Sequence, residues 1–203
     1  MTRLRWRLKA RRMRRVIVED IPWLYACCDS DITAADVASA SRFQNERRRT
    51  EHLAWRRVVR RELGRGVEIG YNEVGAPTLN LENTHLSVAH GAGRVAVVIS
   101  DKKVGIDIES LERDFASVSS RYMSAEEQVL STHKEWGAMV WCAKEALYKL
   151  YGERGLDLKR DIVLTDYNHE EGVICAMLRQ KSKARVEVSL HHTDAVVAVA
   201  EFE

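Results

Sequence analysis

Two segments constrain this chain most, residues 104–109 and 136–152, because they place carboxylates and lysines at regular positions. The first reads VGIDIE and alternates apolar with acidic residues after a glycine, which predicts a strand. Side chains of a strand alternate between its faces, so we expect Asp107 and Glu109 to point the same way, about 7 Å apart. Two carboxylates on one face suit a hard cation such as Mg²⁺, which also takes substrate phosphates as ligands.

The second segment predicts a helix, because apolar residues recur along it at spacings of three and four. Glu145 and Lys149 are four residues apart, so one lies above the other on the helix. Lys144 lies about 100° round from Glu145. The helix can therefore offer a third carboxylate and two cations to one site. Carboxylates for a metal beside lysines for a phosphate predict chemistry at a phosphoryl group.

These two blocks resemble the paired signature of the 4′-phosphopantetheinyl transferases, in particular the larger, surfactin-synthetase-activating type. The pair at this separation is specific, whereas either block alone would be a weak signal. Further blocks extend the resemblance over roughly residues 40–156. They are Arg42-Phe43 with Arg47 and Arg56, Gly75-Ala76-Pro77, Ser87-Val88-Ala89-His90, and Met123-Ser124-Ala125-Glu126-Glu127.

The resemblance implies a reaction in which a serine hydroxyl of an acyl or peptidyl carrier protein attacks the β-phosphoryl group of coenzyme A. Phosphopantetheine is transferred and 3′,5′-ADP leaves. The resemblance implies Mg²⁺ or Mn²⁺ as the cofactor, with Asp107, Glu109 and Glu145 as its ligands. Lys144 and Lys149 would bind the phosphates and the charge that develops on them.

The same resemblance implies that Glu127 takes the serine proton. Its neighbour Glu126 could be mistaken for it, and both acids would also suit the first turn of a helix without any catalytic role. Coenzyme A would be bound by four further residues of the N-terminal half. They are Arg47, Arg56, Ser87 and His90.

One position departs from the family pattern. The family has a lysine between the glycine and the proline where this chain has Ala76. A direct phosphate contact is lost there, and Arg47, Arg56 or the basic N-terminal arm could replace it. The departure affects the expected affinity for coenzyme A rather than the class of reaction.

The order of expected elements is helices followed by strands, twice over, which predicts an α+β class. A helix is expected over residues 45–63, with a short one beginning near residue 31 and two more around Ser124. Short strands are expected over residues 67–109, and antiparallel strands over 161–165, 173–178, 186–191 and 195–202. The resemblance implies a pseudo-dimer of two similar halves, residues 1–101 and 102–203, each with helices packed on a small antiparallel sheet.

The net charge of +2 on 203 residues hides an asymmetry. Residues 1–66 hold 17 Lys and Arg against 8 Asp and Glu, whereas the remainder of the chain is acidic overall. A basic N-terminal part suits a polyanion, which could be coenzyme phosphates, an acidic protein or nucleic acid. Residues 1–15 carry eight basic residues and no acid, and we expect this arm to be frayed.

Four cysteines stand at positions 27, 28, 142 and 175, without the spacing of a zinc site, and we expect reduced thiols. No apolar run approaches the length of a membrane span, and the basic N-terminus lacks the apolar core of a signal peptide. We therefore expect a cytoplasmic monomer with no membrane partner.

Two rival functions remain open. A nucleic-acid-binding module would use the basic N-terminal half, and it predicts exposed aromatics among the arginines. Only Trp6, Phe43 and Trp55 qualify, and the module would leave residues 104–152 unexplained. An inactive homologue would keep the fold and only bind carrier proteins, against which the intact acidic and lysine positions argue.

Overall fold

The structure is a computed structural model that describes residues 13–21 and 31–203. The described part of its N-terminal half holds one helix pair and two small sheets. Its elements are β1 (Arg14–Asp20), α2 (Ala34–Ser41), α3 (Glu46–Leu63), β2 (Ile69–Tyr71), β3 (Pro77–Leu79), β4 (His85–Gly91) and β5 (Arg94–Ser100). The predicted helix over residues 45–63 is confirmed as α3. The Asn45 side chain caps its first turn by accepting from the Arg48 amide, and Gly64 ends it at a φ of 95°.

The C-terminal half holds one long helix and one larger sheet. Its elements are β6 (Val104–Ser110), the 3₁₀ helix η2 (Ala116–Arg121), α4 (Ala125–Gln128), α5 (Trp136–Tyr151), β7 (Ile162–Asn168), β8 (Val173–Leu178), β9 (Ser182–His191) and β10 (Ala195–Phe202). The predicted short helices around Ser124 and the later antiparallel strands are confirmed. Gly152 ends α5 in the left-handed region, with a φ of 72°.

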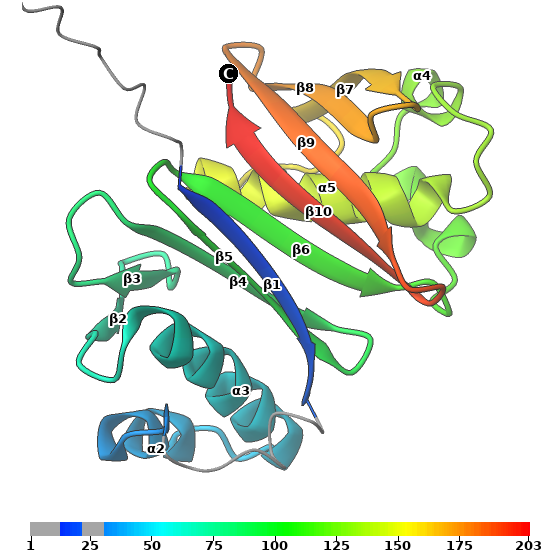
Figure 1. The fold of residues 1–203 in the computed structure, drawn as a ribbon. Helices are drawn as coiled ribbons and strands as arrows, with labels where there is room; N and C mark the ends of the chain where they lie inside the picture. Colours follow the sequence, from blue (N-terminus) through cyan, green and yellow to red (C-terminus); the bar gives the residue numbers. More distant parts are fainter. Residues whose placement is uncertain (1–12, 22–30) are drawn as a thin grey trace, which may run out of the picture.

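The strands form three antiparallel sheets, with the orders β1-β5-β4, β6-β10-β9-β8-β7 and β2-β3. Alternating side chains divide the core into layers. Val95, Val97 and Ile99 on β5 pack against α3, whereas Val98 on the opposite face belongs to a middle cluster. The larger sheet faces that middle cluster with one side and α5 with the other. The order of layers is therefore helix, sheet, sheet, helix (Figure 1).

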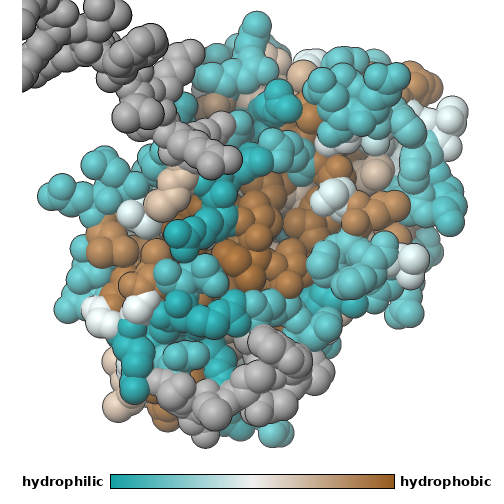
Figure 2. Space-filling view, viewed as in Figure 1, coloured by the Kyte–Doolittle hydropathy of each residue, from teal (hydrophilic) through white to brown (hydrophobic). Residues whose placement is uncertain are grey.

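The middle layer is made of small and branched apolar side chains. Figure 2 shows apolar surface gathered where the two sheets meet. The buried members of this layer are Ala89, Ala96, Val98, Val104, Ile106, Ile108, Ala195, Val197 and Val199. This packing fixes β6 beside β4, and the Ser87 hydroxyl accepts a hydrogen bond from the Ile106 amide at 3.1 Å.

Strand β1 is the main departure from the predicted elements. Arg14 and Arg15 were expected in the frayed arm, but they begin a strand that pairs with β5, with Val16 opposite Val98. Three apolar residues in a row conceal the alternation, because Val16 is 43% exposed at the sheet surface. Residues 1–12 of the predicted arm lie outside the described residues, as do Cys27 and Cys28.

The α+β class is confirmed, with antiparallel sheets and few helices. Each half has a sheet and a long helix, but the sheets differ in strand number, so the pseudo-dimer and its boundary near residue 101 stay predictions. Cys142 and Cys175 are free thiols. Among the described residues, no helix is long and apolar enough to cross a membrane.

Candidate active site

A groove of about 760 Å³ runs between the two halves of the molecule. One wall comes from α3, the β2–β3 hairpin and β4, and the other from β6 and the end of α5. Ser87 and His90 line the first wall, and Asp107, Lys149 and Arg154 line the second. The groove thus brings together side chains from distant parts of the sequence.

Asp107 and Glu109 both face α5, as the alternation of β6 predicted. Lys149 Nζ donates to Asp107 Oδ1 at 2.8 Å, and Trp141 Nε1 donates to Glu109 Oε1 at 2.8 Å. The helix can approach this closely because Gly105 lies beneath it, where a Cβ atom would come within 2.0 Å of the Ala146 carbonyl oxygen. A glycine therefore sets the distance between the acidic strand and the lysine helix.

Glu145 and Glu109 carry signs of a concentrated negative charge. Burial raises the pKa of both carboxyl groups, and the charge of Asp107 raises each pKa further. Arg113 Nη1 partly offsets this at Glu109, from 3.0 Å. The predicted set of three acids is thus within electrostatic reach of one another around Asp107.

The side chains around these acids do not by themselves form a complete metal site. In the part of the chain that the structure describes, no group of three or more His, Cys, Asp or Glu side chains is arranged to hold a metal ion. Lys149 and Arg113 occupy oxygens of Asp107 and Glu109 instead. However, the other oxygen of Asp107, Oδ2, is buried without a hydrogen-bond partner among the described residues. A buried, unpaired carboxylate oxygen beside two further acids fits a hard cation.

Lys149 is held so that part of its ammonium group remains for a ligand. Its Nζ donates to the Ile106 carbonyl at 2.9 Å and to Asp107 at 2.8 Å. An ammonium group has three donors, and the side chain is 30% exposed on the groove wall. Lys149 can therefore donate to an anion in the groove without leaving Asp107.

Lys144 and Glu127 lie elsewhere, and the structure pairs them with each other. Lys144 is fully buried, and its Nζ lies 2.7 Å from Glu127 Oε1 and 3.0 Å from the Leu158 carbonyl oxygen. Glu127, 1% exposed, also accepts from the Ser124 and Leu164 amides at 2.8 Å each. Burial lowers the pKa of Lys144, and Glu127 offsets that effect. This burial argues against a direct contact of either side chain with a substrate.

Ser87 and His90 reach the groove in different ways. The Ser87 hydroxyl is buried and already bonded to the Ile106 amide. The His90 side chain is 51% exposed, and its Nδ1 lies 3.3 Å from Glu51 Oε2. That contact uses Nδ1, so Nε2 is the nitrogen that a ligand in the groove would meet.

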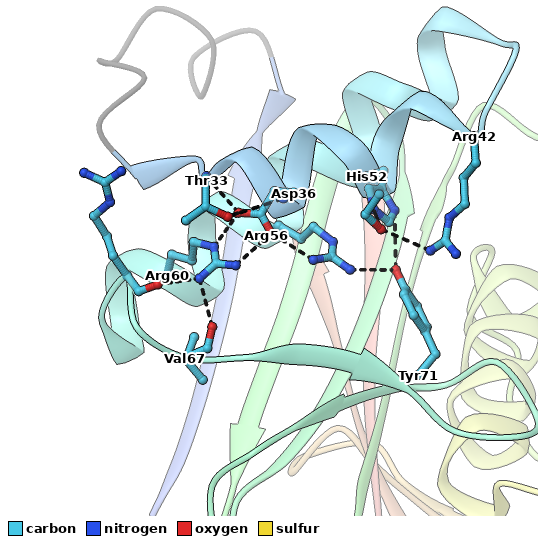
Figure 3. A network of polar contacts seen from close by, with 10 residues as sticks. Thr33, Asp36, Arg42, His52, Arg56, Arg60, Val67 and Tyr71 are labelled. Carbon is cyan, nitrogen blue, oxygen red and sulfur yellow. Dashed lines mark hydrogen bonds and ion pairs between the residues drawn. The ribbon is translucent and has the colours of Figure 1, made fainter.

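The two predicted arginines do not reach the groove. Arg47 is 77% exposed on α3, and its Nε donates to Glu51 at 2.9 Å. Arg56 is 3% exposed, and it donates to Asp36 at 2.8 Å and to the Tyr71 hydroxyl at 3.3 Å (Figure 3). Arg56 lines a second cavity, which shares Tyr71 with the groove. Sequence reasoning missed the Asp36 network, although the spacing of Thr33 and Asp36 is that of a capping box.

Ala76 lies in the tight turn of the β2–β3 hairpin, on the groove wall. Asn72 closes this turn by accepting from the Ala76 amide at 2.8 Å, and Gly75 adopts a φ of 89°. The turn brings no cation of its own. Arg154 reaches it from the opposite wall, where its Nη2 lies 3.4 Å from the Glu73 carbonyl oxygen. Arg154 was not among the residues predicted to bind a ligand.

Comparison with protein families gives a match in the C-terminal half. Residues 103–200 match the model of the 4′-phosphopantetheinyl transferase superfamily. The matched stretch is just under half of the chain, and it runs from the start of β6 almost to the end of β10. It contains Asp107, Glu109, Glu127, Glu145 and Lys149. Comparison with curated proteins gave no match.

The 4′-phosphopantetheinyl transferase superfamily implies transfer of phosphopantetheine from coenzyme A to a carrier protein. A groove between the matched half and the other half, with Lys149 and Arg154 on one wall and His90 on the other, suits a phosphate-bearing substrate. The rival nucleic-acid module depended on exposed aromatics, but Trp55 is 5% exposed in the core beside α3. Trp6 lies outside the described residues.

Proposed function

We propose that this chain is a 4′-phosphopantetheinyl transferase of the surfactin-synthetase-activating type, which converts apo to holo carrier proteins in a Mg²⁺-dependent reaction. One observation carries the proposal. Asp107 and Lys149, from the half that matches the family, face Ser87 and His90, from the other half, across one groove. The volume of about 760 Å³ lies within the range of small-molecule sites.

The coenzyme would lie along the groove with its phosphates against Lys149 and Arg154 on the C-terminal wall. Lys149 contributes donors from that wall, and the His90 ring faces it from the opposite wall. At the hairpin turn, where Ala76 offers no charge, Arg154 supplies the guanidinium group. One of its five N–H donors engages the Glu73 carbonyl, and the others remain for a phosphate oxygen.

Asp107, Glu109 and Glu145 would hold the Mg²⁺ ion, with the unpaired Oδ2 of Asp107 as the oxygen that favours this assignment. A bound divalent ion would withdraw charge from the pyrophosphate and help to orient it. Arg113 and Trp141 both bond Oε1 of Glu109, so Glu109 would contribute through its other oxygen, Oε2.

The transfer forms one bond and breaks one. The serine oxygen of the carrier protein bonds to the β-phosphorus of coenzyme A. The bond from that phosphorus to the oxygen bridging to the α-phosphate breaks, and 3′,5′-ADP leaves with the bonding pair. Lys149, anchored at two points, donates to the phosphate oxygens on which negative charge increases. The serine proton passes to a base, for which Glu127 was the sequence-based candidate.

The burial of Glu127 favours a positioning role instead. Its carboxylate joins three elements, because it accepts from the N-cap of α4, from Lys144 on α5 and from Leu164 on β7. We propose that the pair formed by Glu127 and Lys144 fixes α5, and with it the groove face that carries Lys149. Which group takes the proton is then decided by the pH profile of the Glu127→Gln variant, described in the Discussion.

The proposal is tested by incubating the full-length protein with coenzyme A, Mg²⁺ and apo carrier proteins of fatty acid, polyketide and nonribosomal peptide origin. The expected result is an increase in carrier mass by one phosphopantetheine group, with release of 3′,5′-ADP. Carriers whose acceptor serine is replaced by alanine serve as controls and should gain no mass. Lack of modification of every carrier, with coenzyme binding intact, would favour an inactive carrier-binding homologue.

A further inference from the structure

Glu51 is a nearly buried carboxylate on α3, the helix that borders the groove. Its side chain is 8% exposed, and it is not among the residues that line the groove. Its two oxygens have different partners. Oε1 accepts from Arg47 Nε at 2.9 Å, and Oε2 lies 3.3 Å from His90 Nδ1. An acid outside the groove therefore contacts a histidine on the groove wall.

The backbone of His90 is held firmly, but its ring is not. His90 pairs with Val95 on β5. At the next residue, Gly91, an added Cβ atom would lie 2.3 Å from the Ile108 carbonyl oxygen, so β4 passes close to β6 at this point. The His90 side chain, in contrast, is 51% exposed, and the torsion between Cβ and the ring has broad, two-fold minima. A further contact is needed to decide which edge of the ring faces the groove.

Glu51 provides such a contact. A carboxylate beside Nδ1 keeps a proton on that nitrogen and sets the orientation of the ring. Half a turn of the ring about the same torsion would place a carbon atom against Oε2, and the contact would be lost. Arg47 holds the other oxygen, which keeps the carboxylate itself in one position. Because the carboxylate also repels anions, a negatively charged ligand would meet His90 at Nε2.

We propose that Glu51 is a positioning residue for coenzyme binding, which holds the His90 ring with Nε2 toward the groove. This inference rests on the proposed binding of coenzyme A, and His90 rather than Glu51 would touch the coenzyme. A ring that is oriented before the ligand arrives avoids an ordering cost, which corresponds to about three- to tenfold in affinity. Arg47, expected from the sequence to bind the coenzyme directly, would act through Glu51 instead.

Replacement of Glu51 should leave the protein folded. Removal of a buried charge is most damaging when its partner is buried too and remains unpaired. Here Arg47 is 77% exposed and His90 is 51% exposed, so water can solvate both partners. Glu62→Ala is the matched control, because Glu62 lies on the same helix, pairs with Arg61 and is outside the groove lining.

The first measurement needs no ligand. Nitrogen-15 spectra of the histidine rings, with the His90 signals assigned by His90→Ala, show which nitrogen carries the proton while the ring is neutral. We expect the proton on Nδ1 in the wild type and in Glu62→Ala, and a shift of the population toward Nε2 in Glu51→Ala. Glu51→Gln, which keeps an acceptor oxygen, should restore the Nδ1 form. Equal populations in the wild type and Glu51→Ala would overturn the proposal.

The second measurement is calorimetric titration of the full-length protein with coenzyme A. Glu51→Ala should weaken binding about three- to tenfold in the wild-type background and have no effect in the His90→Ala background, because Glu51 acts only through that ring. Equal losses in the two backgrounds would also overturn the proposal. A wild type that does not bind coenzyme A would contradict the proposed function and, with it, the role of Glu51 in binding. The ring spectra separate that outcome from a failure of the orienting contact.

Discussion

Lys149 on α5 and Asp107 on β6 form an ion pair of 2.8 Å on the wall of the groove, and only one oxygen of the carboxylate is engaged. The remaining oxygen, Oδ2, is buried and has no partner among the described residues. The arrangement places a cationic donor and an unpaired acceptor side by side. It is the arrangement that a phosphate together with its metal ion would complete.

Replacement of Asp107 tests the metal assignment. We expect Asp107→Ala to reduce transfer on the order of 10²-fold or more, because the groove loses its central carboxylate. The midpoint of thermal unfolding should change little, and binding of Mg²⁺ measured by calorimetry should be lost. Asp166→Ala, at an exposed aspartate of β7, is the control. Full activity of the wild type in excess chelator would contradict the assignment.

Arg154 is predicted to compensate for Ala76. Arg154→Ala should raise the KM for coenzyme A about tenfold with little change in kcat, since a phosphate contact distant from the reacting atoms contributes uniform binding. Steady-state kinetics with one carrier protein measure both constants. Ala76→Lys in the Arg154→Ala background should restore part of the affinity. An unchanged KM would show that the guanidinium group only holds Glu73.

His90 is predicted to contact the 3′-phosphate of the coenzyme. His90→Ala should raise the KM for coenzyme A. With dephospho-coenzyme A, which lacks the 3′-phosphate, the KM values of the variant and the wild type should differ less. If the substitution raises the KM equally for the two substrates, His90 does not contact the 3′-phosphate. Arg56→Ala cannot serve as a parallel probe, because Asp36 would lose a buried partner and the fold would be destabilised by several kcal/mol.

Glu127→Gln separates a base from a positioning residue. Buried Lys144 would lose its counter-charge, so we expect a stability loss of about 3–5 kcal/mol, measured by urea unfolding. In a positioning role, kcat falls less than about tenfold and the acidic limb of the pH–rate profile remains; a general base would lose that limb and about 10²–10⁴ in rate.

Two variants serve as references for that experiment. The double variant Glu127→Gln/Lys144→Met should recover much of the lost stability, because no unpaired charge remains inside. Glu126→Gln, at the exposed neighbouring position, should be silent in both assays.

His52 is expected to make stability fall in mild acid. The pKa of His52 is about 4 in the folded protein, below the usual value of 6.5. Between these two pH values the unfolded chain binds a proton at His52 and the folded chain does not. The stability that neutral His52 contributes is therefore fully present above pH 6.5. As the pH falls toward 4, the free energy of unfolding decreases by up to about 3 kcal/mol. Arg42, Arg56, Asp36 and the Tyr71 hydroxyl are the charged and titratable groups around it.

Denaturant unfolding between pH 7 and pH 4 measures the effect as the difference between wild type and His52→Gln. Comparison with a variant is needed because the raised pKa values of Glu109 and Glu145 act in the opposite direction. His85→Gln, at an exposed histidine, is the control. Parallel pH profiles of wild type and His52→Gln would refute the prediction.

The sequence predicts the acidic strand and the lysine helix well, because both depend on local periodicity. The alternation of β6 places Asp107 and Glu109 toward α5. Lys144 lies on a different face of the helix from Glu145, so its side chain points away from these two acids. What Lys144 meets there depends on a residue seventeen positions earlier, and no local pattern contains that information.

The roles of Arg56 and Glu127 were harder to predict for the same reason. An arginine-rich helix suggests a solvated face, but Asp36 from another helix draws Arg56 inside. A short acidic helix suggests exposed carboxylates, but the capping box at Ser124 turns Glu127 back toward its own backbone and Lys144. Long-range pairing of opposite charges decided both cases.

The middle layer between the sheets separates the two walls of the groove, and it is built from alanine, valine and isoleucine side chains. The thickness of this layer sets the distance between the two halves. An added methyl group at Ala96 or Ala195, neither of which lines the groove, would push the halves apart. Substrate preference could therefore drift during evolution through buried positions that never touch a ligand, and directed evolution of this protein should include them.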